Sequence, residues 1–155
     1  MDYAKILSSL QARCAKREYC SQDIYEKALK LFEGDVESAR KALESLREDG
    51  FVSDLRYASA FAREKAAISG WGPVKIRFAL SAKRIEKEVI DQALGEIEAP
   101  RADARMRSLL ENKWKTLAGD SQAKLKLIRF ALSRGYDYDT VAPVINGISA
   151  GTSGS

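Results

Sequence analysis

Apolar side chains recur every three or four residues along most of the chain, which is the spacing of an amphipathic helix. In residues 54–68, for example, Leu55, Ala58, Phe61 and Ala62 would all lie on one side of a helix. No stretch alternates apolar and polar residues well enough to predict a strand. The pattern therefore predicts an all-α fold made of successive amphipathic helices.

Capping residues, glycine and proline mark where these helices should begin and end. Ser21, Asp35 and either Ser53 or Asp54 are expected as N-caps, and Pro73 suits the first position of a helix. The predicted helices span residues 2–17, 22–32, 36–48, 54–68, 73–82, 86–97, 102–117, 122–133 and 139–146.

One six-residue segment occurs twice: Ile76-Arg77-Phe78-Ala79-Leu80-Ser81 recurs letter for letter 52 residues later, from Ile128 to Ser133. A weaker third copy lies about 51 residues upstream, around Tyr25 and Leu29. Repeats of this size bury their apolar faces by stacking on their neighbours. We therefore expect an elongated, right- or left-curved array of three tandem three-helix repeats over residues 1–50, 51–98 and 99–147, with a flexible tail over residues 148–155.

Composition and charge narrow the functional class. Hydrophobic residues make up 45% and charged residues 31% of the chain, which favours a packed core over global disorder. No apolar run is long enough for a membrane span, and the N-terminus lacks the pattern of a secretory signal, so a cytoplasmic protein is expected. The net charge of +4 is uneven, because residues 99–134 hold nine basic and three acidic residues. Such a segment indicates either contact with an anionic surface or a solvated helix face.

Little in the sequence points to catalysis or to a cofactor. There is no histidine, no Cys-x-x-Cys pair and no nucleotide-binding P-loop. Cys14 and Cys20 are expected to be small buried or half-buried residues rather than metal ligands. Gly70-x-Gly72 is a lone fragment between two predicted helices, so it does not indicate a dinucleotide site. We expect a non-enzymatic protein without a cofactor.

The middle of the chain carries two specific motifs. These are Gly50-Phe51-Val52-Ser53-Asp54-x-Arg56-Tyr57-Ala58 and Gly70-Trp71-Gly72-Pro73. Together they resemble the central motif of the RecX family. The flanking Ser21-x-x-x-Tyr25-x-x-x-Leu29 and Arg134-Gly135-Tyr136 resemble the outer repeats of that family, so that the resemblance covers roughly residues 3 to 146. Arg84 departs from the family, which often has glycine there, and this removes the usual reason to expect a left-handed turn.

The resemblance to RecX implies a function that the residue pattern alone does not. Members of the family are all-helical, elongated and curved. They bind the filament of the RecA recombinase on DNA, along its groove, and depress its ATPase and strand exchange; some also bind DNA directly. The resemblance thus implies a regulator of recombination and DNA repair, which we expect to be a monomer and not to bind membranes.

Basic residues on the outer faces of the repeats are the candidates for binding the filament or DNA. On a helical wheel Arg77, Ser81 and Arg84 share one outward strip, and Arg129 takes the place of Arg77 in the second copy. The strip could equally be the solvated side of an amphipathic helix. The full set of candidates is Arg63, Lys65, Lys75, Arg77, Arg84, Lys113, Lys115, Lys124, Lys126, Arg129 and Arg134.

Aromatic side chains are expected mainly in packing roles. Trp71, just before a predicted helix, should pack over the start of that helix, although an exposed contact with a partner is the alternative. Phe78 and Phe130 are expected between repeats, and Trp114 in a core.

Two other functions remain open from the sequence. One is a sequence-independent nucleic-acid binder acting on its own, with strong salt dependence. The other is a helical-repeat scaffold for a different protein.

Overall fold

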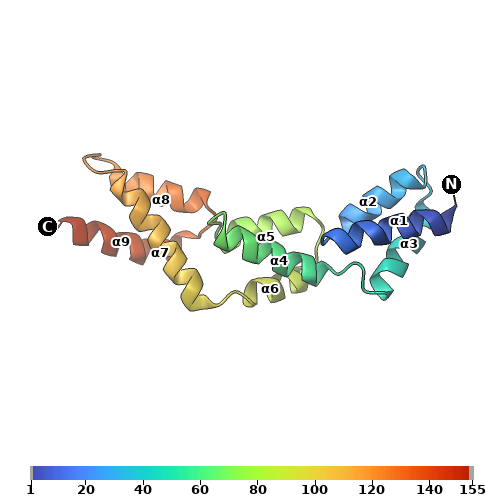
Figure 1. Cartoon of the computed structure of the whole chain (residues 1–155). Helices are drawn as coiled ribbons and strands as arrows, with labels where there is room; N and C mark the ends of the chain where they lie inside the picture. Colours follow the sequence, from blue (N-terminus) through green and yellow to red (C-terminus); the bar gives the residue numbers. More distant parts are fainter. Residues whose placement is uncertain (1, 154–155) are drawn as a thin grey trace. The chain divides into compact units, whose positions relative to one another are not determined.

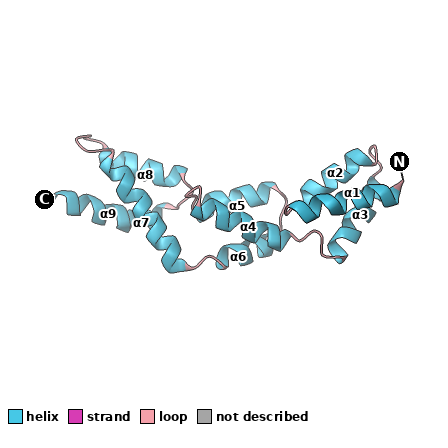
Figure 2. Cartoon of the chain, viewed as in Figure 1, coloured by secondary structure: helices cyan, strands magenta, loops and turns pink. Residues whose placement is uncertain are grey.

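The structure, a computed structural model, describes residues 2–153, which form nine α-helices and no strand (Figures 1 and 2). This confirms the all-α fold. The helices are α1 (Tyr3–Lys16), α2 (Ser21–Leu31), α3 (Val36–Glu48), α4 (Asp54–Ala67), α5 (Pro73–Ala82), α6 (Lys87–Gly95), α7 (Ala99–Lys115), α8 (Ala123–Ser133) and α9 (Tyr138–Ser153). None of these helices combines the length and the apolar character that crossing a bilayer requires.

Two compact units divide the chain, and helices α4, α5 and α6 contribute to both. One unit contains residues 1–60 and 80–93, and the other contains residues 61–79 and 94–155.

The first unit holds a core made by the first three helices. Ile6 and Leu10 from α1 are fully buried there, one helical turn apart, with Ile24 from α2 and Leu46 from α3. Because these side chains recur at helical spacing, each helix turns one apolar stripe inward and leaves its charged side in water. The three helices pack against one another around this core.

The second unit holds a corresponding core made by the last three helices. Leu110 from α7, Leu127 from α8, and Val141 and Ile145 from α9 are fully buried in it. Trp114 is half-buried against the same core, which confirms its predicted packing role.

Helix α9 corrects the prediction for the end of the chain. The sequence predicted a short helix ending at residue 146 and a flexible tail over 148–155, but α9 continues to Ser153. Ile148 is half-buried against the core of the last three helices. Burial of an apolar side chain favours the extended helix and offsets the low helix propensity of Gly147 and Gly151. Residues 154 and 155 lie outside the described residues.

The predicted caps are confirmed at two helices and wrong at one. Asp35 Oδ1 accepts a hydrogen bond from the Ser38 N–H at 3.3 Å, and the bond from the Ser38 hydroxyl to Oδ2, followed by the N–H bond, lowers the pKa of Asp35. Ser53 Oγ accepts from the Arg56 N–H at 3.2 Å at the start of α4. Ser21, in contrast, is the first residue of α2 rather than its cap, because the chain enters the helix one residue earlier, at Cys20.

Candidate partner-binding surface

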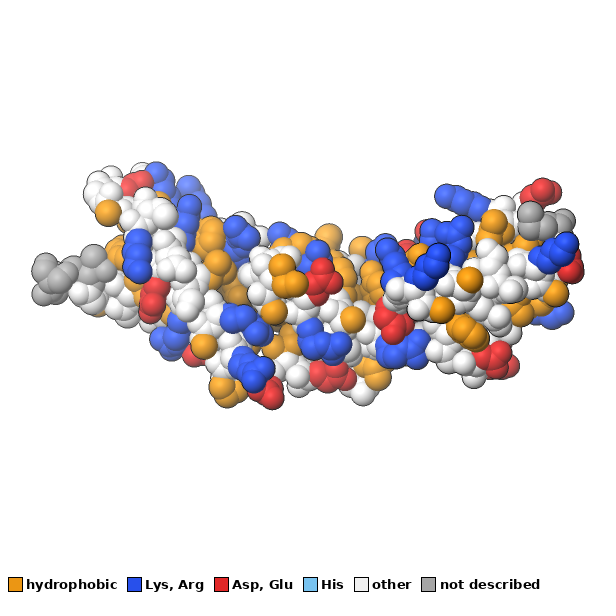
Figure 3. All heavy atoms as spheres, in the orientation of Figure 1, with side chains coloured by type: hydrophobic (Ala, Val, Ile, Leu, Met, Phe, Trp, Pro, Cys, Tyr) orange, Lys and Arg blue, Asp and Glu red, His pale blue; other side chains and the backbone are white. Residues whose placement is uncertain are grey.

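Basic side chains are spread over both units. On the face drawn in Figure 3, Lys and Arg side chains lie over α8 and also over α1 and α2. The excess of charge in residues 99–134 therefore does not by itself define a binding face. The neighbours of each basic side chain show which cations are held by the fold and which are presented to solvent.

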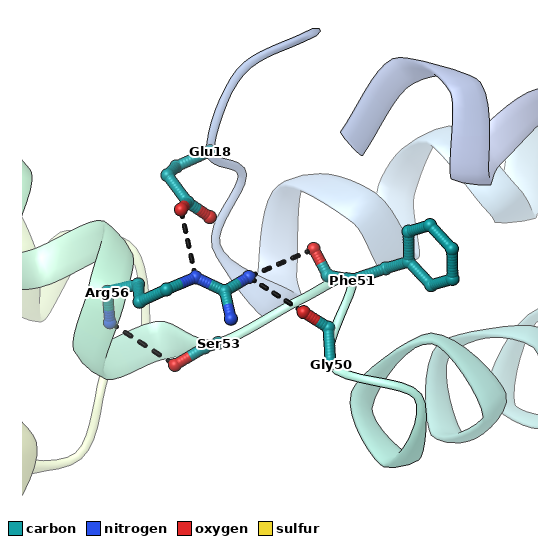
Figure 4. Close-up of polar contacts among 5 residues, drawn as sticks. All are labelled: Glu18, Gly50, Phe51, Ser53 and Arg56. Atoms are coloured by element: carbon teal, nitrogen blue, oxygen red, sulfur yellow. Dashed lines mark hydrogen bonds and ion pairs between the residues drawn. The ribbon is translucent and has the colours of Figure 1, made fainter. Parts of the chain in front are cut away.

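Arg56 joins three segments of the first unit (Figure 4). Its Nε donates to the Glu18 carboxylate at 2.9 Å, and its Nη2 donates to the carbonyl oxygens of Gly50 at 2.9 Å and Phe51 at 3.3 Å. The ion pair is partly exposed and adds little stability, whereas the single Nη2 amino group serves both carbonyl oxygens through its two hydrogens. Arg56 therefore fixes the connection between α3 and α4.

Two further polar contacts connect α2 to the start of α4 and to the turn after α5. Asp54 Oδ1 accepts from the Ser21 N–H at 2.7 Å, which places a negative charge at the positive N-terminus of α2. Lys83 Nζ donates to the Asp23 carboxylate at 3.0 Å, and this bond raises the pKa of Lys83. The motif from Gly50 to Ala58 thus forms a structural junction.

A second junction, in the second unit, explains the motifs Gly70-Trp71-Gly72-Pro73 and Arg134-Gly135-Tyr136. The Gly72 N–H donates to the Arg134 carbonyl oxygen at 2.6 Å, and the Val74 N–H donates to the Gly135 carbonyl oxygen at 2.9 Å. A Cβ on Gly72 would lie 2.5 Å from the Gly135 carbonyl oxygen. Gly135 has a φ of +93°, and a Cβ there would overlap Lys75. Only glycine permits this approach of two backbones.

Two aromatic rings of the second unit each attract two cations. Lys65 Nζ lies 5.0 Å and Lys75 Nζ 4.5 Å from the centre of the Trp71 ring, which packs edge-on against Phe61 at 6.1 Å. The half-buried Trp71 therefore packs beside the start of α5, as predicted. Its flanking lysines are stabilised by the ring and are only partly available to a partner.

Phe130 is the second of these rings. Lys113 Nζ lies 5.3 Å and Arg134 Cζ 5.1 Å from the ring centre. Arg134 also donates to the Ser69 carbonyl oxygen at 3.4 Å. Phe130 is half-buried against the core of the last three helices. Arg134, predicted as a binding residue, is therefore held by the fold.

The predicted binding residues thus fall into two groups. Lys126 joins the held group, because its Nζ pairs with the Asp120 carboxylate. The fold holds Lys65, Lys75, Lys113, Lys126 and Arg134, whereas Arg63, Arg84, Lys115, Lys124 and Arg129 are exposed. Arg77 belongs to neither group, because it is half-buried and already takes part in an interaction.

The two copies of the hexapeptide do not turn the same face to the core. In α5 the fully buried residues are Ile76 and Leu80, whereas in α8 they are Leu127 and Ala131, which are one position earlier in the repeat. One residue corresponds to a rotation of about 100°. The expected equivalence of Arg77 and Arg129 is therefore incomplete, because Arg129 points away from the core and Arg77 points sideways.

This rotation also places Phe78 in solvent. The prediction that Phe78 packs between repeats is wrong, because 78% of the residue is exposed. Phe78 lies two positions after the buried Ile76, which puts it on the opposite side of α5. Val74, one turn before Phe78, is also exposed. Both side chains lie on the outer side of the helix, and Arg77 lies at the edge of that side.

Helix α8 also carries exposed apolar side chains beside an arginine, which we did not predict from the sequence. Leu125 and Leu132 are 44% and 46% exposed, and they lie one turn before and one turn after Arg129. A helical wheel of α8 could have revealed this combination, because Leu125, Arg129 and Leu132 fall within about 60° of one another on it. Exposed apolar side chains beside arginine are typical of protein interfaces.

Arg84 does not belong to the strip predicted on α5. That helix ends at Ala82, and Arg84 lies in the following turn with a φ of +60°. The left-handed turn is thus kept although glycine is absent. Arg84 lines a cleft of the first unit together with residues of α3.

The two cysteines are unpaired and structural, as predicted. Cys14 is half-buried and Cys20 is buried. Burial raises the pKa of Cys20 to about 11, which keeps its thiol neutral at physiological pH.

The fold and the two junctions define an all-helical protein built from three-helix repeats. Family models match two successive three-helix segments: the second three-helix domain of RecX matches residues 53–94, and the third matches residues 102–145. The regulatory protein RecX of Pseudomonas fluorescens is 31% identical over 138 residues, which cover 86% of this chain and 84% of that protein. The chain belongs to the RecX family.

Other relatives extend the comparison. The regulatory protein RecX of Clostridium botulinum strain Eklund 17B is 34% identical over 115 residues, and the match spans about half, 53%, of its length. The crystal structure of RecX from Lactobacillus salivarius has a TM-score of 0.85 at 19% identity and covers 96% of this chain and 97% of that one. Another crystal structure of regulatory protein RecX has a TM-score of 0.82 at 20% identity and covers 93% of this chain and 71% of that one. These two structures share the fold.

Proposed function

We propose that this chain is a non-enzymatic regulator that binds the RecA recombinase filament and lowers its ATPase and strand-exchange activity. Membership of the RecX family supports the class of function. The observation that carries the proposal is the exposure of apolar side chains on the outer side of α5, with Arg77 at its edge, and again around the exposed Arg129 of α8.

This surface suits a protein partner better than a phosphate backbone. Phe78 and Val74 are exposed on the outer side of α5, with Arg77 at its edge, and Leu125 and Leu132 flank Arg129. Interfaces between proteins concentrate their binding energy in aromatic and arginine side chains that become desolvated on contact. A phosphate backbone would use the arginines and leave the apolar side chains in water.

The first test is RecA ATPase on single-stranded DNA, with the protein added at amounts far below one molecule per DNA-binding site. Phe78→Ser changes no charge and removes an exposed ring, so it should preserve the fold and raise the concentration needed for half inhibition at least tenfold. Arg129→Glu should have a similar effect. Ile68→Ser is the control for Phe78→Ser, because Ile68 is also apolar and is 80% exposed. Arg101→Glu is the control for Arg129→Glu, because the Arg101 side chain is 78% exposed.

The alternatives give different results. If inhibition appears only when the protein can coat the DNA, the chain acts as an independent nucleic-acid binder. If Phe78→Ser and Arg129→Glu inhibit as well as the unmodified protein, the outer sides of α5 and α8 are not the binding surface. No inhibition at any ratio would contradict the proposed regulation and leave a scaffold for another protein.

A further inference from the structure

A cleft of about 770 Å³ lies in the unit formed by residues 1–60 and 80–93. Three arginines line it: Arg40 and Arg47 from α3, and Arg84 from the turn after α5. We propose that this cleft binds an acidic segment of a protein partner that also carries apolar side chains. The site is separate from the outer sides of α5 and α8, and it does not depend on the proposed function.

The three arginines carry charge that the first unit does not neutralise. Among residues 2–153, no carboxylate oxygen lies within 4 Å of the guanidinium nitrogens of Arg40, Arg47 or Arg84. Arg56, Arg101 and Arg107, in contrast, each pair with a carboxylate, Arg107 with Asp103 at 2.9 Å. Guanidinium groups that face one cleft without partners favour an anionic ligand, and their planar fork matches a carboxylate.

The spacing of these arginines suits an extended ligand. Arg40 and Arg47 are seven residues apart on α3, which is two helical turns and about 10 Å along the helix axis. A peptide with acidic side chains two to four residues apart can reach both arginines.

The backbone at Arg84 supports a functional role for its side chain. Its φ of +60° is in the left-handed region, where a residue other than glycine, asparagine or aspartate is uncommon and costs about 1 kcal/mol. Glycine would adopt this turn without that cost. A charged side chain is thus placed in the cleft wall at the expense of stability, which indicates a use beyond folding.

The rest of the lining favours a peptide over a nucleic acid. Tyr25, Leu43 and Val89 provide apolar surface that phosphates cannot use. Glu86 and Asp54 also face the cleft, and Asp54 already caps the Ser21 N–H at 2.7 Å. These carboxylates would repel a continuous row of phosphates, but an isolated acidic side chain can lie beside an arginine and avoid them.

The cleft also presents an unused polar group. Ser21 lines it, and among the described residues the buried Ser21 Oγ has no hydrogen-bond partner. A hydroxyl can donate to a carboxylate or a peptide carbonyl. Because this oxygen is itself buried, the Ser21 hydroxyl would bond a ligand in the cleft only after a rotation of its side chain.

The test is fluorescence anisotropy of the full chain with a labelled peptide of sequence Glu-Leu-Asp-Glu-Leu-Asp, at 50 mM salt. The double variant Arg40→Gln/Arg47→Gln should weaken binding at least tenfold. Arg84→Gly should weaken binding about threefold to tenfold. Glycine adopts the left-handed backbone without strain, so this variant should stay folded and weaker binding would report the loss of the side chain. The control Arg13→Gln/Lys16→Gln removes the same charge from exposed residues of α1 and should leave affinity within twofold.

The proposal is wrong if the peptide does not bind, or if the α1 control loses as much affinity for the peptide as the Arg40→Gln/Arg47→Gln variant. It is also wrong if a labelled six-nucleotide oligo-dT binds more tightly than the peptide and its binding depends on Arg40 and Arg47. The last result would assign the cleft to nucleic acid. Phe78→Ser and Arg129→Glu should leave peptide binding unchanged, so that failure of this proposal and failure of RecA regulation are told apart.

Discussion

The main-chain N–H of Gly72 lies 2.6 Å from the carbonyl oxygen of Arg134, so that the start of α5 meets the end of α8 backbone to backbone. Neither residue could be recognised as a contact from its position in the sequence, because 62 residues separate them. The contact depends on the absence of a side chain at Gly72 and at the neighbouring Gly135.

Replacing Gly72 by alanine should destabilise the protein. The added Cβ would meet the Gly135 carbonyl oxygen, which is backbone and cannot rotate away, so we expect a loss of about 1–3 kcal/mol in the free energy of unfolding. Urea denaturation measures this loss. Gly147→Ala is the matched control: it lies within α9, a Cβ there meets nothing within 4 Å, and alanine should stabilise the helix by about 0.5–1 kcal/mol. A Gly72 variant as stable as the unmodified protein would contradict the close approach.

Arg56 should be more important for stability than its ion pair. Arg56→Ala removes the donor to the Gly50 and Phe51 carbonyl oxygens and should cost about 1 kcal/mol, whereas Glu18→Gln removes only an exposed charge and should cost less than about 0.5 kcal/mol. Arg56→Lys should recover only part of this loss, because a single ammonium group cannot reproduce the separate positions of Nε, which bonds Glu18, and Nη2, which bonds the two carbonyl oxygens. Thermal unfolding of the three variants decides the order. A larger loss from Glu18→Gln than from Arg56→Ala would show that the ion pair dominates.

The buried thiol of Cys20 should make stability fall at alkaline pH. Its pKa is raised to about 11 in the folded protein from about 9 in the unfolded chain, so the stabilisation is complete below pH 9 and is lost as the pH rises towards 11. The stability difference between the unmodified protein and Cys20→Ala should therefore shrink by about 2 kcal/mol across that range.

Denaturation at pH 7, 9 and 10.5 measures this change. Cys14→Ala is the control, because Cys14 is only half-buried and its pKa is raised less strongly. A difference between the unmodified protein and Cys20→Ala that does not change with pH would show that the thiol ionises as easily in the folded state as in the unfolded chain.

If the chain also binds DNA, Lys124 and Lys126 should contribute unequally despite their proximity in α8. Lys126 is paired with Asp120, which lowers the pKa of that carboxyl, whereas no carboxylate oxygen among residues 2–153 lies within 4 Å of Lys124 Nζ. Lys124→Gln should reduce the slope of log affinity against log salt for oligo-dT by about 0.7, and Lys126→Gln by less. Anisotropy between 50 and 200 mM salt gives both slopes. Equal reductions would show that the ion pair opens on binding.

Local patterns were enough to predict most of the helices. The spacing of apolar residues and the caps at Asp35 and Ser53 predicted α3 and the start of α4, because these signals act within one helical turn. The end of α9 was missed, because its continuation depends on Ile148 packing against distant helices. The cap of α2 was assigned to Ser21 for the same reason: the carboxylate that bonds its N–H belongs to Asp54, 33 residues later.

The sequence by itself determined the all-helical fold, the repeat and the RecX family, since helical periodicity and family motifs are local properties of the chain. Only the tertiary structure decided which side chains are available to a partner. In the first copy of the hexapeptide, in α5, Ile76 and Leu80 are buried. In α8 the buried residues lie one position earlier, at Leu127 and Ala131. Whether a residue faces the core or solvent depends on where the neighbouring helices pack, and a repeated sequence does not specify that.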